Sequence, residues 1–153
     1  SWKYDVEYSG LNYRLSDINC ALGLSQLSKI KKFIQSRKKS FDYYVKLFKG
    51  KKHIKVPNEY NNNKSSYHLF LLNIDFKSIN KKKDSFFKYM KKNKITCQYH
   101  YIPIYKFSIY KKTMKLKNAE KYFENTVSLP IYFKLEKKIQ QIIVNKILEF
   151  TKK

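Results

Sequence analysis

A short segment near the start of the chain combines a flexible glycine, an amide and an arginine just ahead of an expected helix start. The segment reads Gly10-Leu11-Asn12-Tyr13-Arg14. The planar guanidinium of Arg14 and the side-chain amide of Asn12 could both hold a phosphate, and the free amides of the helix N-terminus would add their dipole. An anion site at Asn12 and Arg14 is therefore one interpretation, and a turn with a surface arginine is the other.

A histidine lies among aromatic residues at the expected end of a strand. The run is Gln98-Tyr99-His100-Tyr101-Ile102-Pro103-Ile104-Tyr105. Strand ends are common places for ligand contacts in α/β sheets, and a neutral imidazole can donate or accept a hydrogen bond near pH 7. His100 is therefore a candidate ligand contact, whereas a histidine packed for structural reasons is the alternative. His53, in a lysine-rich loop, and His68, entering an earlier strand, have less support.

Motifs of several enzyme classes are missing from the sequence. There is no nucleophile motif, and with 3 glycines the chain has neither a Walker-type phosphate loop nor a Rossmann fingerprint. Cys20 and Cys97 lie far apart, and the three histidines are scattered, so neither a disulfide framework nor a metal site is predicted. A reducing cytoplasm fits this cysteine usage best. If the chain belongs to an enzyme, part of the active site lies elsewhere.

The formal net charge of +23 is the feature that would favour a nucleic-acid or anionic-membrane partner. Of the 34 basic residues, however, only Arg14 and Arg37 are arginines, the type that phosphate and base-edge recognition favours. We therefore expect a lysine-rich surface and no nucleic-acid partner, with a small basic nucleic-acid-binding domain as the alternative. No apolar run approaches the ~18 residues of a membrane span, so no membrane partner is expected.

One long helix is predicted from residue 16 to about residue 48, because apolar residues recur there at helical spacing with lysines between them. The apolar positions are Leu27, Ile30, Ile34, Phe41, Tyr44 or Val45, and Phe48. Ser16 can cap the first turn, Asp17 places a negative charge where the helix dipole favours it, and Gly50 supplies a stop.

The remaining elements alternate between strands and helices, which indicates a small α/β layer. We expect a loop over 57–66, strands over 67–75 and 94–99, helices over 80–93, 117–125 and 135–150, and an extended segment at 128–130. The two strands are expected to share one sheet, closed by the last helix.

Four motifs together resemble the DegT/DnrJ/EryC1/StrS family of sugar aminotransferases, and in the expected order they cover the chain from end to end. The longest is the ungapped run Gly10-Leu11-Asn12-Tyr13-Arg14-Leu15-Ser16-Asp17-Ile18-Asn19-Cys20-Ala21-Leu22-Gly23-Leu24-Ser25-Gln26-Leu27. The others are Ser66-Tyr67-His68-Leu69-Phe70, the Gln98 to Tyr105 run, and Ala119-Glu120 leading to Ser128-Leu129-Pro130-Ile131-Tyr132.

The resemblance implies an α/β fold, namely the C-terminal small domain and long connecting helix of the aspartate-aminotransferase architecture (fold type I). Residues 1–50 would be the end of the large domain and the connecting helix, and residues 51–153 the small domain. The resemblance also implies the cofactor pyridoxal 5′-phosphate and a homodimer whose active sites lie at the subunit interface.

Site residues follow from the resemblance residue by residue. Asn12 matches the family position whose side chain reaches the cofactor phosphate of the neighbouring subunit, and Arg14 would lie beside the same site. His100 matches a position lining the sugar-nucleotide pocket, with Tyr99 and Tyr101 beside it as further substrate contacts.

Within the family, the motifs look most like the branch that acts in pseudaminic acid synthesis. That resemblance implies amino transfer from glutamate to C4 of a UDP-4-keto-6-deoxy-N-acetylhexosamine, with another 3-amino or 4-amino sugar-nucleotide aminotransferase as the alternative. The Schiff-base lysine belongs upstream in this family, and none of the lysines here matches its motif. No catalytic residue is therefore assigned, and we expect the chain alone to be inactive. A catalytically dead domain kept for dimerisation is a further alternative.

Overall fold

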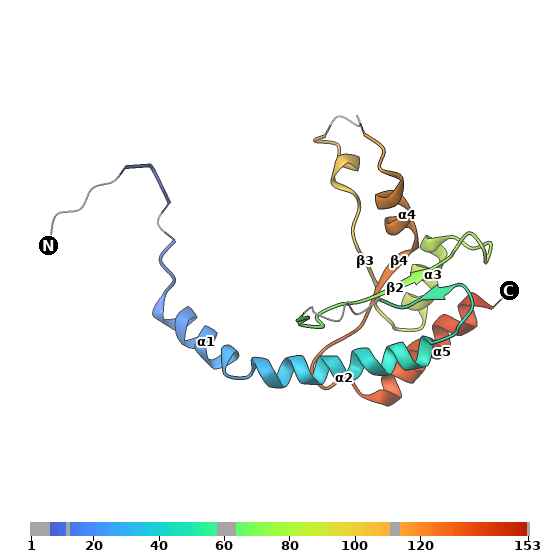
Figure 1. Cartoon of the computed structure of the whole chain (residues 1–153), viewed down its shortest axis with the longest axis horizontal. Helices are drawn as coiled ribbons and strands as arrows, with labels where there is room; N and C mark the ends of the chain where they lie inside the picture. Colours follow the sequence, from blue (N-terminus) through green and yellow to red (C-terminus); the bar gives the residue numbers. More distant parts are fainter. Residues whose placement is uncertain (1–6, 12, 58–63, 111–113, 153) are drawn as a thin grey trace, which may run out of the picture. The chain divides into compact units, whose positions relative to one another are not determined.

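The computed structural model describes residues 7–11, 13–57, 64–110 and 114–152. The chain divides into two compact units, Ser1–Lys31 and Lys32–Lys153. The first unit contains helix α1 (Asp17–Leu27), and helix α2 (Ile30–Phe48) begins where this unit ends. Figure 1 labels these elements along the chain. The sheet and the remaining helices belong to the second unit.

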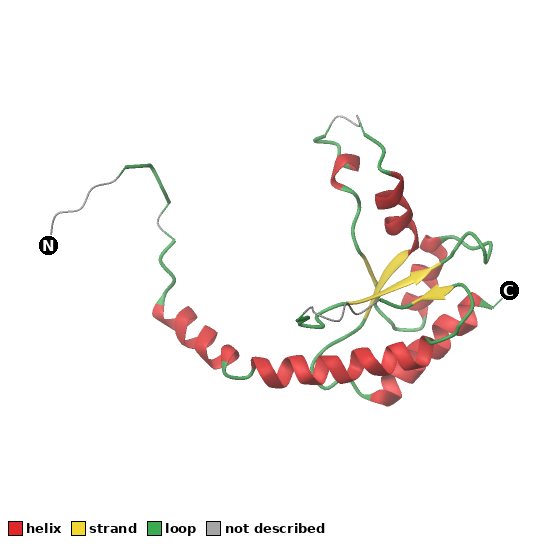
Figure 2. Ribbon diagram, in the orientation of Figure 1, coloured by secondary structure: helices red, strands yellow, loops and turns green. Residues whose placement is uncertain are grey.

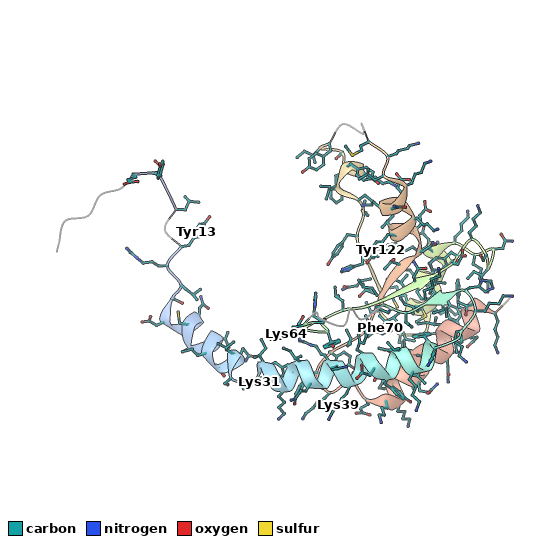
Figure 3. All side chains as sticks on the ribbon, viewed as in Figure 1. Tyr13, Lys31, Lys39, Lys64, Phe70 and Tyr122 are labelled. Carbon is teal, nitrogen blue, oxygen red and sulfur yellow. The ribbon has the colours of Figure 1, made fainter. Side chains whose placement is uncertain are left out.

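Helix α1 begins where the sequence predicts, because Ser16 caps it. The Ser16 hydroxyl accepts a hydrogen bond from the backbone N–H of Asn19 at 3.4 Å, and Asp17 lies in the first turn. None of the α1 residues is buried. Tyr13, labelled in Figure 3, is 84% exposed, and Ile18 is 82% exposed. Apolar side chains exposed in this number are typical of a surface that contacts another protein part.

The prediction of one continuous helix over 16–48 is wrong, because α1 ends at Leu27 and α2 starts at Ile30. At the break, the Ser28 hydroxyl donates to the carbonyl of Ser25 at 2.9 Å, and the N–H of Lys29 donates to the carbonyl of Gln26 at 3.0 Å. A serine hydroxyl bonded to a preceding carbonyl competes with the helical ladder. The helical spacing of the apolar residues continues across the break, so the sequence pattern could not predict where α1 ends.

The second unit contains a four-stranded antiparallel sheet with the strand order β1-β2-β4-β3 (Figure 2). The strands are β1 (Ile54–Lys55), β2 (Phe70–Ile74), β3 (Gln98–Tyr99) and β4 (Thr126–Leu129). The predicted strands over 67–75 and 94–99 are present in shorter form, and they share this sheet. Neither pairs with the other, because β4 lies between them. Only the C-terminal part of β4 was expected to be extended, and β1 was not predicted.

The helices of the second unit lie close to their predicted positions. They are α3 (Lys83–Lys92), α4 (Lys117–Asn125) and α5 (Lys137–Thr151), with a short 3-10 turn, η1 (Ile104–Lys106). Gly50 ends α2 with a backbone φ of +71°, a conformation that glycine adopts without steric cost. Of the loop predicted over 57–66, residues 58–63 lie outside the described residues.

The core forms between α2 and the sheet. Phe70, labelled in Figure 3, is fully buried and is ringed by aromatic side chains of α2, with ring centroids 5.1 Å from Phe41 and 4.8 Å from Tyr44. The Tyr44 hydroxyl donates to the carbonyl of Pro130 at 3.0 Å, and burial raises the pKa of this hydroxyl. Tyr44 thus packs in the core and, through this hydrogen bond, also holds the segment that follows β4.

A buried amide joins α5 to α2. Gln140 is 1% exposed, and its side-chain N–H donates to the backbone carbonyl of Ser40 at 2.8 Å. Polar groups taken out of water need such a partner, since an unpaired one costs about 1–3 kcal/mol. The bond therefore fixes how α5 packs along α2.

We expect Phe70→Ala to lower the free energy of unfolding by about 3–5 kcal/mol, because it removes a buried ring and leaves a cavity. Phe107→Ala is the matched control, since Phe107 is 45% exposed and its removal should cost less than about 1 kcal/mol. Urea unfolding of the two variants and the parent chain measures both values. Equal losses for the two variants would contradict the placement of Phe70 at the centre of the core.

Candidate functional site

Arg14 belongs to the first unit and lies two residues ahead of the α1 cap, with an exposed side chain. Asn12 lies outside the described residues. A guanidinium beside the N-terminus of an 11-residue helix is a donor set that suits a phosphate, because both offer N–H groups and positive charge. Asp17 in the first turn partly offsets that positive charge. The described residues of this segment therefore fit a phosphate group.

The pairing register of β3 decides which face of the sheet the side chains of Gln98 and Tyr99 occupy. Tyr99 pairs with Val127 and Gln98 pairs with Ser128. Val127 is fully buried in the hydrophobic core, so Tyr99 lies on the sheet face that packs against helices. Successive residues of a strand point to opposite faces, so Gln98 and Ser128 share the other face. Tyr99 and Gln98 are therefore directed to different sides of the sheet.

Tyr99 is held by the start of α3. Its ring stacks on Phe87 with centroids 4.0 Å apart and an interplanar angle of 15°, and its hydroxyl donates to a carboxylate oxygen of Asp84 at 2.8 Å. The ammonium of Lys83 lies 4.9 Å from the centre of the same ring. Burial and the bond to Asp84 raise the pKa of Tyr99 to about 12, so the hydroxyl stays protonated and continues to donate.

His100 follows Tyr99 and has a different environment. Its ring packs on that of Tyr101 at 3.9 Å between centroids, and its buried Nδ1 has no hydrogen-bond partner among the described residues. Burial, together with the charge of His68, lowers the pKa of His100 below its ordinary value of 6.5. The imidazole is therefore neutral at pH 7 and able to donate to or accept from a ligand. Tyr101 is 70% exposed.

A small cavity of about 220 Å³ lies beside His68 and Gln98. It is lined by His68, Leu69, Thr96, Gln98, Ser128, Leu129, Pro130, Ile131 and Tyr132. Small-molecule sites usually measure ~300–1,000 Å³, so this cavity suits one group of a larger ligand. Its polar side chains are an imidazole, an amide and hydroxyls, with no acidic side chain and no lysine or arginine among the lining residues. Such a lining favours an uncharged polar group over a phosphate.

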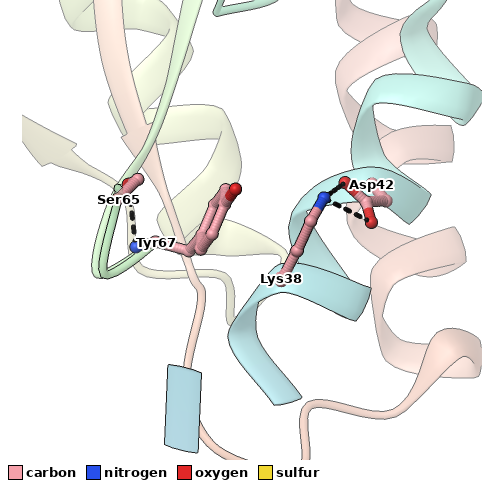
Figure 4. A network of polar contacts seen from close by, with 4 residues as sticks. All are labelled: Lys38, Asp42, Ser65 and Tyr67. Carbon is pink, nitrogen blue, oxygen red and sulfur yellow. Dashed lines mark hydrogen bonds and ion pairs between the residues drawn. The ribbon is translucent and has the colours of Figure 1, made fainter. Parts of the chain in front are cut away.

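The segment leading to His68 is anchored on α2 (Figure 4). The backbone N–H of Tyr67 donates to the Ser65 hydroxyl at 3.0 Å, and the ammonium of Lys38 lies 5.3 Å from the centre of the Tyr67 ring. Lys38 also contacts Asp42, one turn on, at 3.0 Å. These contacts hold the chain at the entrance to β2 and so place His68 at the cavity.

The structure brings together a set of polar residues that sequence reasoning did not join. Thr96, Gln98 and Ser128 were not candidates, and His68 had little support, yet all four line one cavity. The signal that could have found Gln98 and Ser128 is the pairing of β3 with β4, which requires knowing that 126–129 is a strand. Tyr99 and His100 are adjacent in sequence but have separate environments.

The described residues contain neither a candidate metal site nor a candidate membrane span. No group of three or more histidine, cysteine, aspartate or glutamate residues in this part of the chain could hold a metal ion. No helix there has both the length and the apolar character needed to cross a membrane. Cys20 is exposed, and Cys97, which is partly buried, is also a free thiol.

Comparison with known proteins gives a match over almost the whole chain. Residues 1–148 match the model of the DegT/DnrJ/EryC1/StrS aminotransferase family. The chain is 30% identical over 155 aligned residues to the UDP-4-amino-4,6-dideoxy-N-acetyl-beta-L-altrosamine transaminase of Campylobacter jejuni, covering 99% of this chain and 41% of that protein. The Helicobacter pylori transaminase of the same name is 32% identical, and the match covers 95% of this chain and 39% of that protein.

Solved structures show the same relationship. Helicobacter pylori PseC, an aminotransferase involved in the biosynthesis of pseudoaminic acid, matches with a TM-score of 0.86 and 31% identity over 97% of this chain and 40% of that chain. Spr1654 of Streptococcus pneumoniae, solved in a PLP form, matches with a TM-score of 0.80 and 26% identity. This match covers 100% of this chain and 41% of that chain. The chain thus spans about two fifths of the length of these relatives. It belongs to the DegT/DnrJ/EryC1/StrS aminotransferase family, and it has the α/β fold of these aminotransferases over that part of their length.

Proposed function

We propose that this chain is part of a pyridoxal-phosphate-dependent aminotransferase that moves an amino group from glutamate to C4 of a UDP-4-keto-6-deoxy-N-acetylhexosamine. The product would serve the synthesis of pseudaminic acid or a related surface sugar. The observation that carries this proposal is the 30% identity to the Campylobacter jejuni transaminase over 99% of the chain. The TM-score of 0.86 with Helicobacter pylori PseC supports it.

A second candidate is a sugar-nucleotide aminotransferase of the same family with a different substrate. The Escherichia coli dTDP-4-amino-4,6-dideoxy-D-glucose transaminase is 31% identical over 88% of this chain, close to the value for the Campylobacter protein. Identity at this level does not separate the two sugars, so the choice depends on the substrate test below.

The cofactor side of the proposal involves the first unit. Arg14, together with the amides at the start of α1, would hold the cofactor phosphate, and Asn12 would add a donor from the preceding residues. Pyridoxal phosphate, when bound, supplies the electron sink that amino transfer requires. The tasks of this chain would be to bind and orient that phosphate. The PLP and PMP forms of Spr1654, 26% and 25% identical to this chain, support the choice of cofactor.

The substrate side involves the second unit. His100 would donate to or accept from the sugar nucleotide through its unpartnered Nδ1. The cavity at His68 and Gln98 would take an uncharged substituent, such as a hydroxyl or an acetamido group, because its lining is polar and neutral. Tyr99 and the exposed Tyr101 are the other candidate substrate contacts.

The proposed assembly is a cytoplasmic homodimer with the active site at the subunit interface. Residues 1–50 would end the large domain and connect it to a small domain at 51–153, and the catalytic lysine would come from the large domain. The exposed apolar side chains of the first unit support this arrangement, because they need a protein surface to cover them. The two free cysteines support a reducing compartment.

We expect the full-length protein to show the visible absorbance of enzyme-bound pyridoxal phosphate and to aminate a UDP-4-keto sugar in the presence of glutamate. The residue 1–153 chain, measured as a control, should show neither property because it lacks the family lysine. Absorbance spectroscopy detects the bound cofactor, and mass analysis of the sugar product detects the amination. A full-length protein that gains no such absorbance on addition of pyridoxal phosphate contradicts the proposal, and preference for a dTDP sugar selects the second candidate.

Asn12 and Arg14 are expected to serve the active site whose lysine belongs to the other subunit. Asn12→Ala removes one donor from a buried phosphate and should weaken cofactor retention by about 1–3 kcal/mol, with a larger loss for Arg14→Ala because its group is charged. Arg37→Ala, the other arginine of the chain, is the matched control and should retain the cofactor normally. Equilibrium dialysis of pyridoxal phosphate against each full-length variant gives these values.

Mixed dimers distinguish the two subunit assignments. A subunit with Asn12→Ala is combined with a partner that lacks the catalytic lysine. If Asn12 acts across the interface, one site carries both defects and the other carries none, so each verified heterodimer keeps one working site. Activity near zero would place Asn12 in the site of its own subunit instead.

A further inference from the structure

The end of β3 is a weakly supported part of the sheet that carries a candidate functional residue. β3 has two residues and lies at the sheet edge, where it pairs with β4. Residues 100–103 follow with neither helix nor strand. His100 is the first residue beyond the paired region, so its position depends on what holds Tyr99.

Three side chains of α3 hold Tyr99 from different directions. Phe87 stacks on one face of the ring at 4.0 Å, Asp84 accepts from the hydroxyl at 2.8 Å, and the ammonium of Lys83 lies 4.9 Å from the ring centre. Stacking, a charge-assisted hydrogen bond and a cation–π contact together restrain both the plane of the ring and its rotation.

The support for Tyr99 is itself fixed in the core. Phe86 and Met90 of α3 are fully buried. The Lys83 ammonium donates to the backbone carbonyl of Phe123 in α4 and lies 4.4 Å from the centre of the Phe123 ring. Tyr99 is thus tied to α3, which the core holds in place, and Lys83 links this anchor to α4. Movement of the Tyr99 ring would break several contacts at once.

His100 depends on this anchor for its position. β3 ends at Tyr99, so no strand pairing holds His100 itself. The Nδ1 of His100 is nevertheless buried, and it has no hydrogen-bond partner among the described residues. The placement of this nitrogen therefore depends on the neighbouring residue that is held, Tyr99.

We propose that Tyr99 is a positioning residue: held by Phe87, Asp84 and Lys83, it fixes the end of β3 and so keeps the Nδ1 of His100 buried and in place. Tyr99 then acts through His100 and needs no contact with the sugar. That His100 meets a sugar nucleotide rests on the proposed function, whereas its placement by Tyr99 does not.

The test follows the three histidines by NMR titration of the 1–153 chain, in which His53 serves as an internal reference. Tyr99→Leu removes the stack, the hydrogen bond and the cation–π contact. His100 should then move into water, so its pKa should rise toward the ordinary value of 6.5. The ring signals of His53 at fixed pH should not change.

Tyr99→Phe keeps the ring between Phe87 and Lys83 and loses the bond to Asp84, so the pKa of His100 should rise by less than in Tyr99→Leu. Tyr43→Phe is the matched control, because it removes a tyrosine hydroxyl that contacts Gln141 on α5. It should leave His100 as in the parent chain.

Each outcome decides the proposal. A folded Tyr99→Leu variant, with dispersed amide signals, in which His100 titrates as in the parent chain would overturn it. If Tyr99→Leu does not fold, Tyr99→Phe decides in the same way, since an unchanged His100 titration there also overturns it. A full-length protein that binds no pyridoxal phosphate refutes the proposed function alone, because these titrations need neither cofactor nor activity.

Discussion

Everything in the second unit depends on the packing of an aromatic helix face against one side of the sheet. Phe41, Tyr44 and Phe48 of α2 surround Phe70 of β2, and all four are buried. Rings bury more area per residue than aliphatic side chains, which lets a four-stranded sheet with two very short edge strands remain ordered. Because one face is closed in this way, the polar residues of β3 and β4 are left to the other face, and the candidate site forms there.

The sequence predicted the elements that carry strong apolar periodicity and failed where local polar chemistry or long-range pairing decides. The last helix and α3 were anticipated within a few residues, and the run from Phe70 to Ile74 was correctly expected to be a strand. The break at Ser28 was missed because a hydroxyl bond to a nearby carbonyl leaves the apolar spacing unchanged. β1 was missed because a two-residue strand exists only through its partner.

The candidate site, too, could be predicted only in part from the sequence. His100 could be singled out from its residue type and its place after a strand, but the separate environments of Tyr99 and His100 follow from a register that only pairing with β4 defines. The cavity residues come from segments about 30 residues apart, such as Gln98 and Ser128, and no local pattern joins them. For Asn12 and Arg14, family resemblance supplied the roles, and spacing alone supplied no more than a possible anion site.

The hydrogen bond from the Tyr44 hydroxyl to the carbonyl of Pro130 makes the core and the candidate site share a residue. Pro130 lines the polar cavity on one side, and its carbonyl is held from within the core on the other. Residues that share a partner do not behave as independent sites when they are changed. Substitutions that repack α2 should therefore alter ligand preference as well as stability. Evolutionary divergence of core and specificity would then proceed in correlated steps in this part of the family.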